Sequence, residues 1–267
     1  MVYMKTQARA PKTIRFGSEA FEAAGKTVIR WLGNGGLFIN SRGTCLMVDP
    51  LLEGYDMPLL IDMPIEAKDV PKLDAVLVTH SDGDHFSLPT CGNLSGVCGE
   101  YHSTPYVCGL MKENKLYSFG HLAGEQFRVG NIGVTVTPAD HMWQNSGEFG
   151  NFNRVFMPED CCGFLLETPD GTIWAPGDSR LMEAHLNMAA PDLILFDFSD
   201  DPYHIGFENA VRLANHYPDS ILILSHWGSV DAPELLPFNG DPQKLSGRIT
   251  NPGRVELLAP GEPYLLV

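Results

Sequence analysis

The sequence predicts an α/β fold in which β-sheets are covered on their outer faces by helices. Runs rich in β-branched and aromatic residues dominate the first half of the chain, and strands alternate with helices in the second half. With 267 residues, 44% of them hydrophobic, the chain can bury a substantial core. We expect a single folded domain over residues 25–267. Before it, residues 1–24 form an N-terminal extension for which the pattern predicts no structure.

The expected strands begin with a meander of three, "TVIRWLG", "GLFIN" and "CLMVDP", turned by Gly35, Gly36 and "SRG". Because its glycines lead into another strand, "GNGG" at 33–36 is interpreted as a hairpin turn and not as a phosphate-binding loop. The further strands expected are "DAVLVTH", "TPYVC", "EQFRVG", "IGVTVTPADH", "CCGFLLET" and "GTIWAPGD". The Asp-Gly pair of "PDG" predicts a hairpin between the last two.

Two helices are expected in the second half. One runs from Ser179 to Met188 and is opened by the serine. The other runs from about Gly206 to Tyr217, because Phe207, Ala210, Val211 and Ala214 repeat at helical spacing. It lies between the apolar strands "DLILFDF" and "SILILSH", which completes a β-α-β unit.

Charge and hydropathy exclude several classes of function. The formal net charge of −15 repels polyphosphate backbones, so we expect no nucleic-acid partner. No apolar run reaches the length of a signal peptide or a membrane span, which predicts a cytoplasmic protein without membrane contact. The six cysteines form no C-x-x-C pair and are interpreted as reduced thiols. A homo-oligomer is compatible with the sequence, which does not fix the oligomeric state.

Several strands end in the same kind of residue. The four strands in question end at His80, His141, Asp178 and His226. Since rigid strand ends bring groups far apart in sequence to one point, these terminations predict a metal site. In "THSDGDHF", His80 and Asp82 can face one ion while Asp84 and His85 face another, with Gly83 allowing the turn. A carboxylate and imidazole set suits first-row divalent ions.

These motifs resemble the metallo-β-lactamase superfamily, whose signature H-x-H-x-D-H is followed by a single His, Asp and His at strand ends. The flanking stretches "WLGNGGLFI", "LMVDP", "DAVLVTHSDGDHF", "VTPADH", "APGDSR" and "LSHWG" are similar to the branch of metal-dependent hydrolases that contains L-ascorbate 6-phosphate lactonase. The resemblance extends from about Thr27 to the C-terminus. It identifies a superfamily more closely than a substrate.

The resemblance implies a four-layer αββα sandwich with two divalent ions, manganese, zinc or iron, at one edge. It assigns the first ion to His80, Asp82 and His141, and the second to Asp84, His85 and His226, with Asp178 bridging them. A histidine lies near the substrate in that branch, and His204 in "PYHIGFENA" stands at the matching place. Asp49 in "LMVDP" either orients the ligand loop, the stretch from His80 to His85, through a hydrogen bond or only closes its strand.

Asp82 departs from the family pattern, which has a histidine there. The aspartate makes the loaded site neutral in a charge count, and its harder oxygen favours manganese or iron relative to zinc. Alternatively, Asp82 binds no metal and acts as a general base beside a mononuclear site.

We therefore expect a hydrolase that uses a metal-bound hydroxide on a small-molecule substrate, with Asp84, Asp178 and His204 in catalytic roles. The leading substrate is a lactone or other cyclic ester of a small polar metabolite. The alternatives are a small phosphodiester, an iron-dependent oxygen or sulfur reaction, and a non-catalytic binding protein.

The segment after His141, "MWQNSGEFGNFNRVFMPED", is interpreted as either a substrate lid or a plain surface loop. It offers Trp143 and Arg154 for substrate binding. Asp197, Asp200 and Asp201 follow a strand on the same side, as substrate contacts or as turn formers. His102, His121, His185 and His216 lack matching partners and are interpreted as structural or surface histidines.

Overall fold

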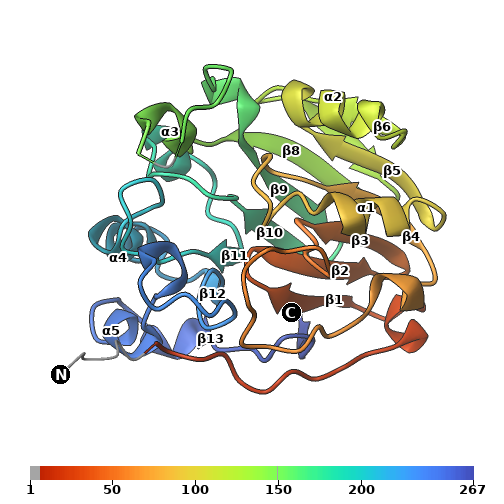
Figure 1. Ribbon diagram of the computed structural model, residues 1–267. Helices are drawn as coiled ribbons and strands as arrows, with labels where there is room; N and C mark the ends of the chain where they lie inside the picture. Colours follow the sequence, from red (N-terminus) through yellow and green to blue (C-terminus); the bar gives the residue numbers. More distant parts are fainter. Residues whose placement is uncertain (1–6, 149) are drawn as a thin grey trace.

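The computed structural model describes residues 7–148 and 150–267. Its strands form two seven-stranded sheets, and helices cover the outer side of each sheet (Figure 1). The layers are therefore those of the predicted αββα sandwich, which is confirmed. The extension predicted for residues 1–24 lies partly outside the described residues.

The first sheet has the order β14-β1-β2-β3-β4-β5-β6. Strands β1, β2 and β3 pair antiparallel, as the meander predicts, whereas β3 to β6 run parallel. The bounds are β1 Thr27–Gly33, β2 Gly36–Ser41, β3 Thr44–Val48, β4 Leu73–Leu77, β5 Cys98–Ser103, β6 Ser118–Gly120 and β14 Pro263–Leu265.

The second sheet has the order β13-β12-β11-β10-β9-β8-β7. Strands β7 to β10 pair antiparallel, including the predicted β9–β10 hairpin, and β10 to β13 run parallel. The bounds are β7 Gln126–Val129, β8 Ile132–Pro138, β9 Cys162–Thr168, β10 Gly171–Ala175, β11 Leu193–Phe196, β12 Ile221–Leu224 and β13 Val255–Glu256.

Alternation along the strands divides the core. In β2, Leu37 and Ile39 belong to the large cluster shared with the second sheet, while Phe38 between them packs on the outer side. Successive strand residues point to opposite faces, so both faces of the first sheet are apolar and both need a covering layer. The outer cluster receives Cys91 and Leu94 from one helix, with further residues from the next.

Five α-helices and six short 3₁₀ helices are found in the part of the chain that the structure describes. The α-helices are α1 Leu88–Leu94, α2 Pro105–Glu113, α3 Glu183–Leu186, α4 Phe207–His216 and α5 Pro242–Ser246. The 3₁₀ helices are Ser18–Phe21, Ala67–Asp69, Trp143–Ser146, Pro158–Asp160, Leu236–Phe238 and Pro252–Arg254. Helix α4 buries Ala210, Val211, Leu213 and Ala214, which confirms the predicted apolar face.

One predicted element is wrong and another is wrong in part. "TPYVC" is not a strand but the start of α2, because the Thr104 side chain accepts a hydrogen bond from Val107 N and Pro105 occupies the first turn. The helix expected from Ser179 is reduced to the single turn of α3. The hydroxyl of Ser179 instead accepts from Asp140 N and donates to the carbonyl of Arg180.

The described part of the N-terminal segment follows the surface of the domain. Ala10 N donates to the carbonyl of Gly228 at 3.0 Å, and Ile14 N donates to that of Pro260 at 2.9 Å. The side chain of Gln7 donates to the carbonyl of Val230. The bonds to Gly228 and Val230 tie the segment to the chain just after β12, close to His226, and the bond to Pro260 ties it to the chain before β14.

Candidate metal centre

The predicted ligands meet where the strands of both sheets end. His80 follows β4, His141 follows β8, Asp178 follows β10 and His226 follows β12. All four side chains are buried, with at most 4% of each residue exposed. The convergence that the strand ends predict is present in the structure.

Asp84, His85, Asp178 and His226 form one compact donor group. The Nε2 atoms of His85 and His226 lie 2.9 Å apart, and Asp178 Oδ1 lies 3.2 and 3.1 Å from them. Asp84 Oδ2 lies 3.7 Å from both nitrogens. These atoms face one common point.

His80, His141 and Asp178 form a second group. The Nε2 atoms of His80 and His141 each lie 3.8 Å from Asp178 Oδ2. Asp178 thus turns one carboxylate oxygen toward each group. Burial alone would raise the pKa of Asp178, but the facing imidazoles of His226 and His85 hold that pKa well below its usual range.

Asp82 stands beside the second group without belonging to its compact set. Its Oδ2 lies 3.2 Å from Nε2 of His141 and 3.5 Å from Nε2 of His80. Trp143 Nε1 donates to the same oxygen at 2.6 Å, and Gln144 Nε2 donates to Oδ1 at 2.7 Å. Burial would raise the pKa of Asp82, but His80 and His141 hold it well below its usual range. Ligation by Asp82 stays a prediction.

Asp49 organises the ligand loop from behind, as the first of the two sequence readings expects. Its Oδ2 lies 2.8 Å from Nδ1 of His85 and accepts from the Thr79 hydroxyl at 2.6 Å. Thr79 N donates to Oδ1 at 2.7 Å, and the Thr79 hydroxyl lies 2.9 Å from Nδ1 of His80. One buried carboxylate therefore directs two imidazoles.

These outer contacts show that the residues fit a metal. Because Nδ1 of His85 donates to Asp49, its Nε2 presents a lone pair to His226 and to Asp178. Likewise, Nε2 of His80 is buried without a hydrogen-bond partner. Burial would lower the pKa of His85, but Asp178 and Asp84 hold it well above its usual value, so the position favours a positive charge. Lone pairs and carboxylates that converge in this way are a ligand set for divalent cations.

His204 lies between two carboxylates at the same centre. Its Nδ1 lies 3.0 Å from Asp201 Oδ1, and its Nε2 lies 2.9 Å from Asp178 Oδ2. Burial would lower the pKa of His204, but Asp178 and Asp201 hold it well above its usual value. Asp201, one of the three acidic residues left open by the sequence, therefore orients His204.

Arg154 and Trp143, predicted to bind substrate, have partners of their own. Arg154 pairs with Asp160, and its guanidinium lies 3.6 Å from the ring centroid of Tyr106. Trp143 donates to Asp82. The segment that carries them is therefore fastened at two places, and substrate contact by either residue stays a prediction.

Sequence reasoning missed residues that touch the centre. Asn34, in the turn interpreted only as a hairpin, donates from Nδ2 to Asp84 Oδ2 at 2.9 Å. A Cβ atom on the next residue, Gly35, would lie 2.5 Å from Cε1 of His85, so the ring requires glycine there. No pattern in the turn at 33–36 predicted either contact.

The discounted histidines have contacts outside this centre. His102 and His121 lie 2.9 Å apart between their ring nitrogens and stack on Phe127, and His185 bonds to the carbonyl of Pro138. His216 makes a ring contact with its neighbour in sequence, Tyr217.

Across residues 7–148 and 150–267, the structure has no helix both long enough and apolar enough to cross a bilayer.

Comparison with known proteins gives a consistent result. A family model described as "Beta-lactamase superfamily domain" matches residues 44–227. The chain is 25% identical over 247 residues to a UPF0173 metal-dependent hydrolase of Archaeoglobus fulgidus, covering 88% of this chain and 97% of that protein.

Two solved structures share the fold at 17% identity. A possible metal-dependent hydrolase from Veillonella parvula has a TM-score of 0.70 and covers 91% of this chain and 100% of its own. An isothiocyanate hydrolase from Delia radicum gut bacteria has a TM-score of 0.68 and covers 90% of this chain and 100% of its own.

Proposed function

The chain belongs to the β-lactamase superfamily, and from this premise we propose that it is a metal-dependent hydrolase of lactones or other cyclic esters of small polar molecules. The observation that carries the proposal is the position of Asp178, which turns one carboxylate oxygen toward each of two donor groups. Two ions would be held, one by His80, His141 and Asp178, with Asp82 beside them, and one by Asp84, His85, Asp178 and His226.

When bound, divalent ions supply a nucleophile at neutral pH and stabilise negative charge that develops on oxygen. The chain itself supplies position and protons. Asp49 holds the ligand loop, and Asn34 holds Asp84. His204 lies between the carboxylates of Asp178 and Asp201, which raise its pKa, so it can hold a proton on each ring nitrogen, and the one on Nε2 can pass to the leaving oxygen of the ester.

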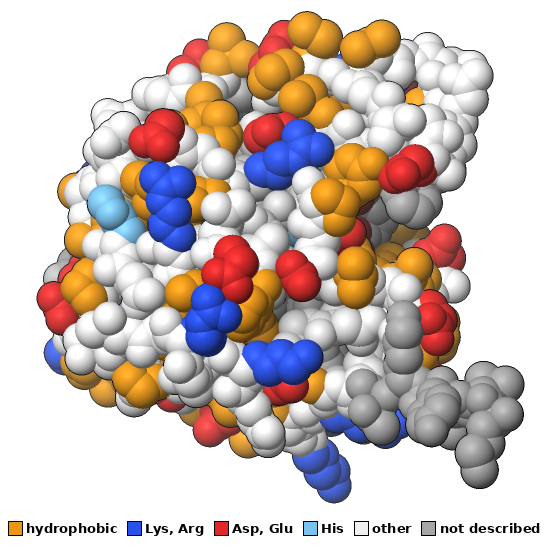
Figure 2. All heavy atoms as spheres, turned by 90° about the vertical axis from the view of Figure 1, so that its left-hand side faces the viewer, with side chains coloured by type: hydrophobic (Ala, Val, Ile, Leu, Met, Phe, Trp, Pro, Cys, Tyr) orange, Lys and Arg blue, Asp and Glu red, His pale blue; other side chains and the backbone are white. Residues whose placement is uncertain are grey.

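The surroundings support a neutral substrate over a phosphodiester. Arg154, the cation predicted for an anionic ligand, is committed to Asp160 and to the ring of Tyr106. On the face turned toward the viewer in Figure 2, basic side chains lie beside acidic ones and form no continuous basic patch. Two ion pairs on that side of the molecule, Arg212 with Glu183 and Arg248 with Glu208, follow the same pattern.

A substrate panel tests the proposal. Protein loaded with manganese or zinc is assayed with γ- and δ-lactones, a linear aryl ester, an isothiocyanate and bis(p-nitrophenyl) phosphate. The isothiocyanate is included because the fold is shared with an isothiocyanate hydrolase. We expect the highest kcat/KM on a lactone and loss of activity after chelation. A higher kcat/KM on the phosphodiester, or activity that survives chelation, would contradict the proposal.

Replacement of His204 should separate catalysis from metal binding. In His204→Gln, we expect kcat/KM on the best lactone to fall by about 100-fold or more, because the proton donor is lost. The metal content should stay unchanged. His216→Gln, on the exposed end of α4, is the matched control and should behave like the native protein. Unchanged kcat/KM in His204→Gln would remove the histidine from the reaction.

Asp82→His should change which metal is preferred. Nitrogen in place of a harder oxygen favours zinc, so the zinc-to-manganese ratio taken from an equimolar mixture should rise by at least about tenfold. Asp82→Asn keeps an oxygen ligand and is the matched control, for which we expect no such rise. Elemental analysis reads the ratio. If Asp82→His leaves the ratio unchanged, Asp82 lies outside the metal shell.

A further inference from the structure

Four of the five histidines at the metal centre have a partner on the ring nitrogen that points away from the donor groups. The pairs are His80 with the Thr79 hydroxyl, His85 with Asp49, His141 with the Tyr203 carbonyl, and His204 with Asp201. His226 is the exception, because its Nδ1 is buried and has no hydrogen-bond partner. The residue itself is only 1% exposed.

Asp197 has a buried hydrogen-bond acceptor without a partner. It follows β11 directly and is 7% exposed. Its Oδ1 accepts from the backbone N of Ser199 at 2.9 Å and from the Ser199 hydroxyl at 2.5 Å, but its Oδ2 is buried without a partner. Burying a carboxylate oxygen without a hydrogen bond costs free energy of folding, so a hydrogen-bond donor is expected beside Oδ2.

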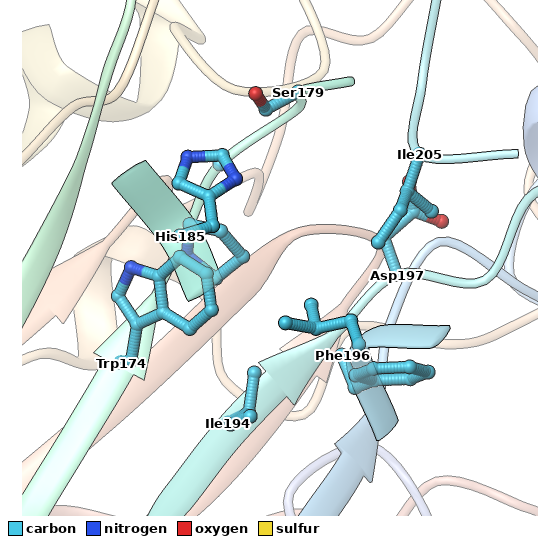
Figure 3. Close-up of a pocket in the computed structure, with 10 residues that line it drawn as sticks. Trp174, Ser179, His185, Ile194, Phe196, Asp197 and Ile205 are labelled. Carbon is cyan, nitrogen blue, oxygen red and sulfur yellow. The ribbon is translucent and has the colours of Figure 1, made fainter. Parts of the chain in front are cut away.

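Both unpartnered residues line one small cavity. The cavity has a volume of about 10 Å³ and includes Asp197, His226, Ser225 and Asp178 in its lining. This is about the space that one water molecule requires. Asp197 also lines a second cavity of about 20 Å³, where Figure 3 shows it across from Trp174 and His185. Asp197 therefore borders two water-sized spaces.

We propose that a buried water molecule joins His226 to Asp197. Nδ1 of His226 donates to the water oxygen, and the water donates to Oδ2 of Asp197. The chain of bonds places the imidazole proton on Nδ1 and leaves the lone pair on Nε2 facing Asp178 and His85. Asp197 is thus a positioning residue for one donor group and touches no ion itself.

The inference rests on the proposed two-ion centre, and its test distinguishes the two. Asp197→Asn keeps the shape and an oxygen for Ser199 but loses the charge and the second acceptor. Measured by chelator competition, the affinity of the protein for one of the two ions should fall roughly 10–100-fold, and its affinity for the other should stay unchanged. Asp192→Asn is the matched control, because Asp192 precedes the same strand at its other end and its side-chain Oδ2 accepts from the backbone N and the hydroxyl of Thr172. The control should retain both affinities.

Two readouts besides activity decide the matter. In a high-resolution crystal structure of the metal-loaded native protein, we expect a water oxygen within hydrogen-bond distance of His226 Nδ1 and Asp197 Oδ2. An empty cavity there, or unchanged affinities in both Asp197→Asn and Asp197→Ala, would overturn the inference while leaving the metal centre standing. Native protein that binds no ion would overturn the proposed function and this inference with it.

Discussion

Asp178→Asn is expected to abolish both metal binding and hydrolysis. The substitution keeps the shape of the side chain but removes the charge that both donor groups share. Metal ions contribute several kcal/mol of transition-state stabilisation, so we expect kcat/KM on the best lactone to fall by about 1,000-fold or more. Elemental analysis of the same preparation should find neither ion at stoichiometric level.

Asp140→Asn is the matched control for this result. Asp140 adjoins His141 in sequence, but its side chain pairs with Arg180 at 3.5 Å. We expect this variant to retain two ions and nearly native kcat/KM. If Asp178→Asn still held two ions tightly, the assignment of Asp178 as a ligand shared by both ions would be wrong.

Asp49→Ala is expected to weaken the fold as well as the centre. The variant leaves Thr79 N, the Thr79 hydroxyl and Nδ1 of His85 without their buried acceptor. Removing one partner from a buried, charged network costs about 3–5 kcal/mol, which urea unfolding of the metal-free protein would measure. Metal affinity should fall roughly 10–100-fold, because His85 loses its outer partner and the Thr79 hydroxyl that contacts His80 loses its own acceptor.

Asp74→Ala provides the comparison for Asp49. Asp74 is exposed, lies near the opposite end of the β3–β4 pair, and its side chain accepts from Cys45 N at 2.7 Å. Its loss should cost only about 1 kcal/mol and leave metal affinity intact. Equal losses of unfolding free energy in the two variants would show that Asp49 has no special role.

The strand ends could be predicted from the sequence because their signal is local. His80, His141, Asp178 and His226 each follow an apolar run, and strands place the ends of such runs at one edge. The same local reasoning failed for "TPYVC", where the capping side chain of Thr104 outweighed the β-branched and aromatic composition. Local pattern identifies an element well only where no cap competes.

The outer partners of the ligands could not be predicted, because they come from distant segments. Asn34 reaches Asp84 across 50 positions, and the carbonyl of Tyr203 reaches His141 across 62. A backbone carbonyl carries no sequence signature at all. Asp49 and His204 were found through the resemblance to a known family, whereas Asp201 was one of three acidic residues that the sequence could not distinguish.

The most direct test of the two-ion centre is anomalous diffraction from crystals of native protein loaded with manganese or zinc. We predict two anomalous peaks, one beside Oδ1 of Asp178 near His85 and His226, and one beside Oδ2 near His80 and His141. A single peak, or peaks that do not touch Asp178, would contradict the account.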